Sequence, residues 1–175
     1  MRCIRIDSNS KLLNKIYEIN DEAFPEEERM SVEEMFTFDI ASELLGFIVD
    51  EKLIGFSLVL LNEKTVFLVL LAIDKSLRGK GYGSRALNAI MQVYPDRQFV
   101  LDFEEVMESA ENYEQRLSRK NFYLRNGFHE TGHFTVLCGE RYEVVCTGSV
   151  LDEAALYPIM NAIHEHTPEF ENRLR

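Results

Sequence analysis

Residues 66–87 read V-F-L-V-L-L-A-I-D-K-S-L-R-G-K-G-Y-G-S-R-A-L, and the rest of the chain is organised around them. Residues 66–73 are apolar throughout, which is typical of a strand covered on both faces. A short polar turn and three glycines follow, and from Leu87 the apolar residues recur at helical spacing. The order is therefore a buried strand, a glycine-rich turn and the start of a helix.

The turn between this strand and this helix suits an anion. The first amides of a helix have no partner within the helix, and the peptide dipoles place positive charge there. Glycine permits a left-handed backbone and a close approach of a ligand, while Arg78, Lys80 and Arg85 add formal charge. These features predict a binding site for a phosphate or pyrophosphate group.

Other glycine-rich loops fit the chain less well. A dinucleotide-binding fingerprint needs the spacing G-x-G-x-x-G, whereas the glycines here are Gly79, Gly81 and Gly83. A Walker loop, G-x-x-x-x-G-K-[ST], does not occur. The remaining alternative is a flexible connector that binds nothing.

Two motifs resemble the GNAT superfamily, the Gcn5-related N-acetyltransferases. The acetyl-CoA loop of that family reads [QR]-x-x-G-x-[GA], and residues 78–83, R-G-K-G-Y-G, match it position by position. Residues 121–128, N-F-Y-L-R-N-G-F, resemble the family's F-Y-x-x-x-G-F segment and lie at about the usual distance from the loop. The resemblance covers roughly residues 1–148.

The resemblance implies a fold as well as an activity. The expected fold is α/β (α+β): a central mixed, mostly antiparallel sheet with splayed central strands, flanked by helices. A length of 175 residues favours one domain over residues 1–175. Its core is expected at about 1–148, with a C-terminal helix and tail at about 149–175.

The remaining pattern predicts the other elements. Gly55 lies within a predicted strand and is expected to mark a close approach of another backbone or a bulge. Residues 164–175 are expected to form a solvated tail. Helices are expected from Leu12 to about residue 20–23, from Gly83 or Ser84 to residue 93, and over residues 110–125. Two more are expected to begin at capping residues, one after Ser31, with Glu34 as its capping-box partner, and one after Asp152. Strands are expected at 3–6, 44–49, 53–61, 98–103, 128–138 and 142–147.

The resemblance also implies which residues hold acetyl-CoA. Backbone groups near the end of the central strand are expected to pair with the pantetheine arm, and the loop to bind the pyrophosphate. Many members carry an Asn seven residues before the motif tyrosine; here that position is Arg116, and Asn112 could serve instead. For Arg116 and Arg119 the alternative is surface salt bridges. The expected cofactor-binding residues are Leu71, Ala72, Ile73, Arg78, Gly79, Lys80, Gly81, Tyr82, Gly83, Ser84, Asn112 and Arg119.

Acyl transfer to an amine needs a base for the amine and an acid for the leaving thiolate. The resemblance makes Tyr123 the expected general acid, and the alternative is an aromatic core residue. Asp102, Glu104 and Glu105 end a predicted strand, where a partly desolvated carboxylate could have a raised pKa and act as the base. Alternation places Asp102 and Glu104 on one face. The alternatives are that a water relay serves as the base, or that these carboxylates are only a solvated strand end.

Composition excludes several other classes of protein. A net charge of −11 argues against nucleic acid and is compatible with a cationic acceptor. Cys3, Cys138 and Cys146 form no C-x-x-C pair, so neither a disulfide framework nor a metal site is expected, and Cys138 and Cys146 read as small buried hydrophobes. His129 and His133 fall in a predicted strand, away from a metal-binding helical spacing. No signal peptide or membrane span is recognisable, so a cytoplasmic location is expected.

The sequence therefore predicts an acetyl-CoA-dependent N-acetyltransferase that acts on a primary amine through a ternary complex. The alternative is a GNAT-like CoA sensor or scaffold without turnover. The expected partners are a CoA thioester and an amine-bearing small molecule or peptide, and a second copy could pack on the apolar C-terminal helix as a homodimer. Residues 26–28, E-E-E, are either a solvated turn or a rim that attracts the amine.

Overall fold

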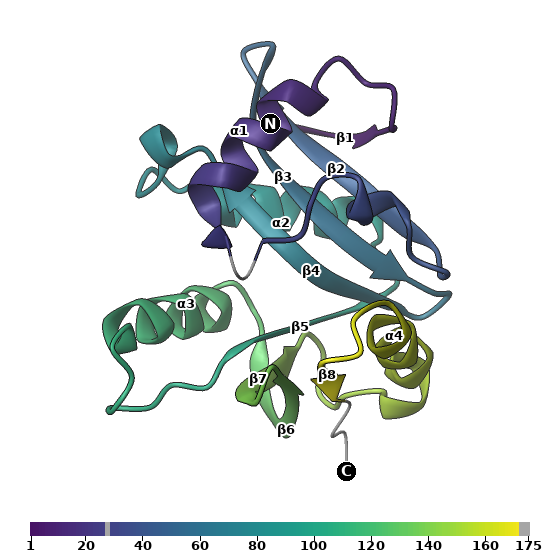
Figure 1. The fold of residues 1–175 in the computed structure, drawn as a ribbon, viewed down its shortest axis with the longest axis vertical. Helices are drawn as coiled ribbons and strands as arrows, with labels where there is room; N and C mark the ends of the chain where they lie inside the picture. The colour runs from purple at the N-terminus through teal and green to yellow at the C-terminus, as the bar shows by residue number, and fades with distance from the viewer. Residues whose placement is uncertain (27–28, 172–175) are drawn as a thin grey trace. The chain divides into compact units, whose positions relative to one another are not determined.

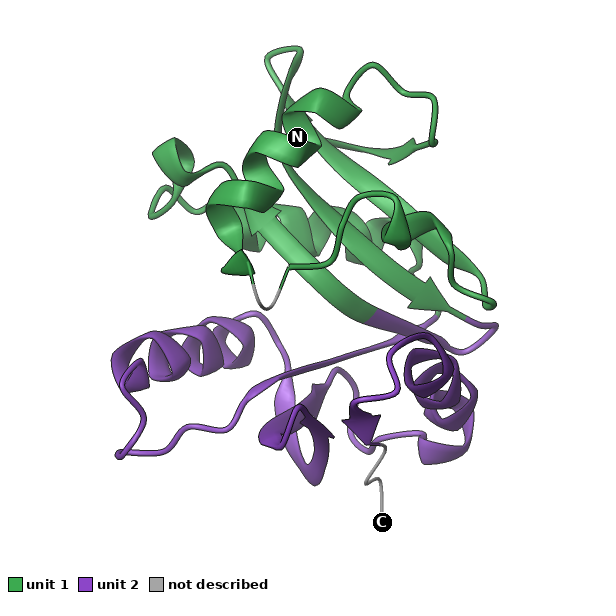
Figure 2. Cartoon of the chain, in the orientation of Figure 1, with its two compact units in different colours: residues 1–61, 68–96 green, residues 62–67, 97–175 purple. Residues whose placement is uncertain are grey.

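The computed structural model describes residues 1–26 and 29–171. The chain forms two compact units: unit 1 comprises residues 1–61 and 68–96, and unit 2 comprises residues 62–67 and those from 97 onward (Figure 2). Eight strands form a mixed sheet in the order β1-β2-β3-β4-β5-β7-β6-β8 (Figure 1). This is the α+β architecture predicted from the resemblance, whereas a single domain over the whole chain stays a prediction.

Unit 1 carries the first antiparallel part of the sheet, with β1 at its edge. Asp50 and Glu51 have φ values of 47° and 60°. They therefore form the kind of two-residue turn whose twist matches that of the strands it joins. The strands of this part are β1 (Arg2–Ile6), β2 (Ser42–Val49), β3 (Lys52–Leu61) and, from Leu68 onward, β4 (Thr65–Ile73).

The helical elements of unit 1 are short. They are α1 (Leu13–Ala23), the 3-10 turns η2 (Glu34–Phe36) and η3 (Lys75–Leu77), and α2 (Tyr82–Val93). The apolar face of α1 packs on the strands because Ile16 and Ile19 recur at helical spacing. The core cluster around them contains Ile6, Val32, Met35, Leu44, Ile48, Leu53, Phe56, Leu58 and Ala72.

The helix predicted after Ser31 is only the single turn η2. Its capping box does form, since the Ser31 amide donates to Glu34 Oε2 at 2.7 Å and the Glu34 amide donates to Ser31 Oγ at 3.3 Å. The turn ends at Phe36, where Thr37 and Asp39 are weak helix formers. A cap without a helix-forming segment behind it cannot extend the helix.

Unit 2 is built around β5, which pairs antiparallel with β7 over five residue pairs. Thr65, Val66 and Phe67 at the start of β4 pair parallel with β5, and the described chain has no further β4–β5 pair. The central ladder is therefore short, as predicted for splayed strands. The elements of this unit are β5 (Gln98–Glu104), α3 (Tyr113–Arg125), β6 (His129–Leu137), β7 (Glu140–Cys146), α4 (Glu153–His166) and β8 (Phe170–Glu171).

The prediction of a solvated tail from residue 164 is wrong for the described residues. Helix α4 starts at the predicted cap, where Asp152 Oδ1 accepts from the Ala155 amide at 3.0 Å, and it continues past Pro158 to His166. β8 then pairs with β6. Phe170, only 5% exposed, anchors the segment by burying its ring. Residues 172–175 of the predicted tail lie outside the described residues.

Two expectations about burial also need correction. The middle of β4, residues 69–71, is only partly buried, whereas β3 is buried at every position except Lys52. Since successive strand residues alternate between faces, neither face of β4 is fully covered there. Cys146 is buried as predicted, but Cys138 is exposed, because it lies in the β6–β7 turn with a φ of 50°.

Candidate active site

The loop predicted to bind phosphate leaves β4 through a tightly bonded turn in unit 1. Asp74 caps η3, accepting at Oδ1 from the Ser76 amide at 3.0 Å, and Lys15 of α1 lies 3.0 Å from its other oxygen. Arg78 Nε donates to the Ile73 carbonyl at 3.1 Å and so fastens the loop to the end of the strand. Arg78, the first residue of the matched motif, therefore holds the loop against the end of β4 as well as adding positive charge.

Gly79 and Gly81 have left-handed φ values of 76° and 78°. A Cβ atom added at either residue would have no heavy atom within 4 Å. The loop therefore needs glycine at these positions because of the left-handed backbone, and not because a larger side chain would clash with its surroundings. Gly81 is the N-cap residue of α2, so the left-handed turn comes immediately before the first residue of the helix.

The start of α2 presents a row of free backbone amides. The amides from Gly79 to Ser84 have no hydrogen-bond acceptor within the described residues, and the first helical bond runs from the Arg85 amide to Gly81 O at 3.2 Å. Lys80 and Arg85 are exposed beside them, with Arg85 over the Tyr82 ring at 5.1 Å. Free amides, a helix dipole and cations are the features that phosphate sites share, and binding of the cofactor's pyrophosphate by this loop stays a prediction.

The end of β4 lies close to β3. A Cβ atom at Gly55 would approach the Ala72 carbonyl oxygen to 2.4 Å, so Gly55 marks a close approach of two backbones. The register of β2 and β3 also shifts beside it, between Phe47 and Ile48, so both predicted roles of Gly55 find support. Ala72 and Ile73 are buried, and Leu71 is partly exposed. The pairing of these three residues with the pantetheine arm stays a prediction.

In unit 2, the F-Y-x-x-x-G-F segment is the C-terminal end of α3. The Phe128 amide donates to the Tyr123 carbonyl at 3.2 Å, and the Gly127 amide donates to the Leu124 carbonyl at 3.3 Å. Gly127 has a φ of 89°. This is a Schellman motif, in which the left-handed residue lets the chain turn back over the last helical turn. The motif glycine thus fixes the segment that carries the motif tyrosine.

Three aromatic rings enclose the ring of Tyr123. Phe103 of β5 stacks on it at 5.8 Å with an interplanar angle of 9°, and Phe122 and Phe128 meet it edge-on at 5.1 and 5.7 Å. Burial raises the pKa of Tyr123 to about 12; the positive charge of Arg119 lowers this pKa and the negative charge of Asp102 raises it further. The phenol therefore stays protonated at neutral pH.

The carboxylate of Asp102 in β5 accepts a hydrogen bond from the Thr135 hydroxyl of β6, which lies 2.6 Å from Oδ2. Thr135 is fully buried. Burial raises the pKa of Asp102 to about 6, although the hydrogen bonds that its carboxylate accepts from the Thr135 hydroxyl and from the backbone amide of Asp102 itself lower this pKa. This carboxylate can therefore gain and lose a proton near neutral pH.

Glu104, the second predicted base, is held in a buried ion pair. Its carboxylate accepts from Asn112 Nδ2 at 3.1 Å and from Arg119, and lies 3.7 Å from Arg116 Nε. Glu104 and Arg116 are only 5% and 9% exposed. Arg116 also donates to the Glu105 carbonyl at 3.1 Å. The predicted surface salt bridge of Arg116 is therefore a buried one.

The structure thus separates the predicted residues into groups. Asn112 and Arg119, predicted to contact the cofactor, direct their side chains to Glu104, and Arg116 joins them. The salt bridges expected as the alternative for Arg116 and Arg119 therefore form, but the burial of Arg116 was not expected, and Thr135 was not predicted at all. A signal for Arg116 existed, since Asn112 and Arg116 are spaced i, i+4 in a predicted helix that follows an acidic strand end.

Other chemistries find little support in the described chain. The described residues hold no cluster of three or more His, Cys, Asp or Glu side chains arranged for a metal ion. His133 lies 3.5 Å from Glu153 and His129 lies 3.5 Å from Cys146. None of the helices in these residues has both the length and the apolar character to cross a bilayer.

Comparison with known proteins points to one family. A family model described as acetyltransferase (GNAT) family matches residues 13–128, whereas the curated protein sequences give no match. Among solved structures, a protein from Bacteroides thetaiotaomicron assigned to the GNAT acetyltransferases is 23% identical, with a TM-score of 0.72 over 97% of this chain and 98% of that one.

Two further structures contain coenzyme A. An aminoglycoside 6'-N-acetyltransferase is 16% identical, with a TM-score of 0.63 over 84% of this chain and 96% of that one. A Bacillus subtilis acetyltransferase is 15% identical, with a TM-score of 0.60 over 85% of this chain and 99% of that one. At these identities the likeness is one of fold.

Proposed function

Since the chain belongs to the GNAT acetyltransferase family, whose members take an acetyl group from acetyl-CoA, we propose that it transfers this group to a primary amine by direct attack within a ternary complex. The observation that carries the proposal is the row of free amides from Gly79 to Ser84, in the loop that matches the family's cofactor motif. These amides bind the pyrophosphate of the thioester. The backbone of residues 71–73 pairs with its pantetheine arm.

Asp102 is the general base of this proposal. Its pKa of about 6 makes it largely a carboxylate at pH 7, with enough affinity for a proton to accept one from the attacking amine. Glu104 suits this role less well than predicted, since three donors already surround its carboxylate. Glu104 instead positions α3, the helix that carries Tyr123.

Tyr123 is the general acid. When the tetrahedral intermediate collapses, the C–S bond breaks and the phenol gives its proton to the departing thiolate. The charge of Asp102 raises the pKa of Tyr123. Proton uptake by Asp102 removes that charge, so the first proton transfer makes the second one easier.

The test is release of free thiol from acetyl-CoA with a panel of amines, next to calorimetric binding of CoA. We expect binding in the absence of an amine, and thiol release only in its presence. Gly81→Glu places a carboxylate among the free amides and is expected to abolish CoA binding; Gly139→Glu, in the β6–β7 turn, has a similar φ and is the control. Binding without thiol release for every amine would favour a CoA sensor over an enzyme.

A further inference from the structure

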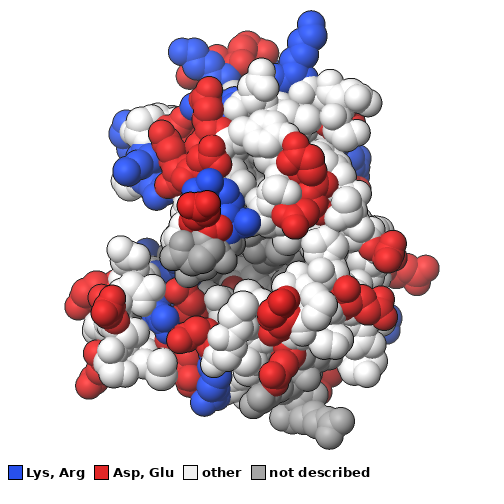
Figure 3. All heavy atoms as spheres, viewed as in Figure 1, with Lys and Arg blue, Asp and Glu red and all other residues white. Residues whose placement is uncertain are grey.

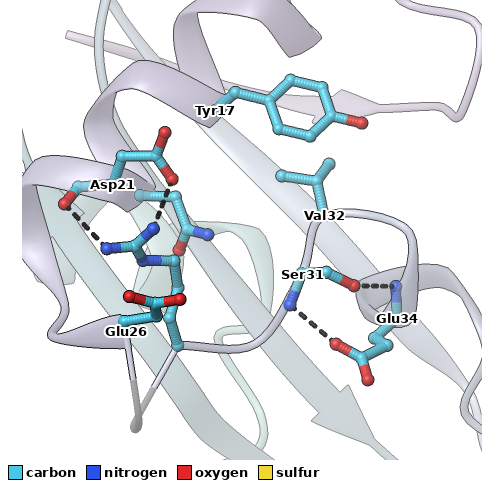
Figure 4. A pocket seen from close by; sticks show the side chains of 8 residues that line it. Tyr17, Asp21, Glu26, Ser31, Val32 and Glu34 are labelled. Atoms are coloured by element: carbon cyan, nitrogen blue, oxygen red, sulfur yellow. Dashed lines mark hydrogen bonds and ion pairs between the residues drawn. The ribbon is translucent and has the colours of Figure 1, made fainter.

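The charged side chains around a pocket in unit 1 serve the local fold. This pocket has a volume of about 290 Å³ and lies beside α1 (Figure 4). Its walls include the ion pair between Arg29 and Asp21, at 2.8 Å, and the capping box of Ser31 and Glu34. Each of these contacts joins residues that lie within eight positions of one another. They therefore fix one short segment of unit 1.

Unit 2 contains a buried carboxylate that the proposed chemistry does not use. Glu143 lies in β7 and is 7% exposed, although burying a charged group costs free energy unless the group is paired. Other charged side chains lie at the surface, as Figure 3 shows for one face, and water and salt screen them there. Glu143 has a partner from another element: Nζ of Lys120, in α3, donates to its two carboxylate oxygens at 3.1 and 2.9 Å.

Lys120 also forms an ion pair with Glu130 of β6. Because the two carboxylates belong to different strands of the β6–β7 hairpin, one ammonium group joins α3 to both strands. The side chain of Glu130 is 54% exposed, whereas that of Glu143 is 10% exposed. An exposed ion pair contributes little to stability. The contact that constrains α3 is therefore the one with Glu143.

This contact lies beside the proposed general acid. Phe103 of β5 is the cross-strand partner of Glu143, so these two side chains stand next to each other on one face of the sheet. Tyr123 of α3 stacks its ring on Phe103, while Lys120, three positions earlier, binds Glu143. Residues three positions apart are neighbours on one side of a helix. One cross-strand pair therefore holds α3 at two neighbouring points.

The two points constrain α3 in different ways. Aromatic rings pack favourably in several offset and edge-on arrangements, so the stacking on Phe103 leaves room for the helix to slide. Charge-assisted hydrogen bonds are shorter and directional, so the bonds from Lys120 to Glu143 fix the helix more closely. A buried ion pair is seldom more stabilising than apolar residues of similar volume. The pair is therefore better explained by the geometry it imposes than by its stability.

We propose that Lys120 is a positioning residue for the acetyl transfer, and that its pair with Glu143 holds α3 where the Tyr123 hydroxyl can reach the departing thiolate. The role of Tyr123 in this inference rests on the proposed function. The anchoring of α3 rests on the contacts of Lys120 itself. Lys120 acts through the helix and does not touch the substrates.

Replacing both partners by apolar residues separates geometry from stability. Lys120→Met alone leaves Glu143 buried without its cation and should lower Tm. The double variant Lys120→Met/Glu143→Leu leaves no buried charge at this contact, so its Tm should return close to the wild-type value. Its kcat for thiol release should nevertheless stay roughly tenfold or more below wild type, because a small displacement of the acid suffices for such a loss. Calorimetric CoA binding should be unchanged.

Glu130→Gln is the matched control, because it removes the exposed partner of the same lysine. It should keep the wild-type Tm and kcat. Hydrogen exchange gives a readout that needs no substrate: in the double variant the amides in the last turns of α3 should exchange several-fold faster, and those of β5 at the wild-type rate. If the double variant does not fold, Glu143→Gln replaces it, and its kcat should fall while that of Glu130→Gln does not.

The outcomes separate this inference from the proposed function. A double variant with wild-type kcat and wild-type exchange in α3 would overturn the inference and leave the proposed function standing. If no amine releases thiol from the wild-type protein, the proposed function is wrong. Faster exchange in α3 of the double variant would then still support the anchoring by Lys120, and unchanged exchange would overturn it.

Discussion

Replacing Gly127 by alanine isolates the contribution of the Schellman motif to the position of Tyr123. A Cβ atom at Gly127 would meet no heavy atom within 4 Å, so the substitution introduces no steric clash. Its cost is the left-handed backbone at φ 89°, about 1–2 kcal/mol for a residue with a Cβ. For a chain of this length, that corresponds to a fall in Tm of roughly 2–8 °C.

The effect on activity is expected to exceed the effect on stability. A relaxed backbone at residue 127 loosens the hydrogen bond from the Phe128 amide to the Tyr123 carbonyl, together with the contact between the two rings. A small displacement of an acid can cost roughly tenfold to a hundredfold in rate. The assay is thiol release at saturating amine, next to CoA binding, which should stay at the wild-type value.

Gly132→Ala is the matched control for this prediction. Gly132 lies in β6 with a φ of 77°, and its added Cβ would also meet nothing within 4 Å. We expect the same loss of Tm as for Gly127→Ala and near wild-type kcat. Equal losses of kcat in both variants, or no loss of Tm in Gly127→Ala, would refute the role given to the motif.

Three further predictions concern the residues of unit 2. Tyr123→Phe should lower kcat and leave CoA binding unchanged in calorimetry; an unchanged kcat would remove its role as the acid. Asp102→Asn should abolish the rise of rate with pH near pH 6. Because burial raises the pKa of Asp102, wild-type stability falls as pH rises from about 4 to about 6. Thermal melts should therefore show Asp102→Asn above the wild type at pH 8 and equal to it at pH 4, and the opposite order would be evidence against a buried carboxylate. Glu104→Gln leaves the buried Arg116 with only the exposed carboxylate of Glu140, 3.6 Å from its Nη1, as a charge partner, and should cost roughly 2 kcal/mol or more in denaturant unfolding; a loss below about 1 kcal/mol would place this pair among ordinary surface salt bridges.

The local features of the fold were accessible from the sequence. The strand at residues 66–73, the glycine-rich loop after it and the start of the next helix were all predicted. Each of these features depends only on residues that are neighbours in the sequence. The helix predicted over residues 110–125 ends at Arg125 for the same reason, since Gly127 lies only two residues beyond it. The capping-box hydrogen bonds between Ser31 and Glu34 and the helix cap at Asp152 were predicted correctly as well.

The long-range partners could not be read in this way. Thr135 reaches Asp102 across 33 positions of the chain, and nothing local to either residue specifies that hydrogen bond. The β8 strand has only two residues, so it lacks the alternation that marks a strand, and it forms because β6 offers a pairing edge. The Asn20 side-chain amide donates to the Met30 carbonyl, which lies beyond the end of its own helix, and nothing within that helix indicates the bond.

The turn at Cys138 has a practical consequence for these experiments. Its thiol is exposed, whereas Cys146 is buried and Cys3 is intermediate. Any reagent that counts sulfhydryls will therefore also report this position, adding about one equivalent of background per enzyme molecule. The same position offers a point for attaching a maleimide dye at the tip of the β6–β7 hairpin. Because glycine readily adopts a φ of 50°, Cys138→Gly should remove this background signal without disturbing the turn.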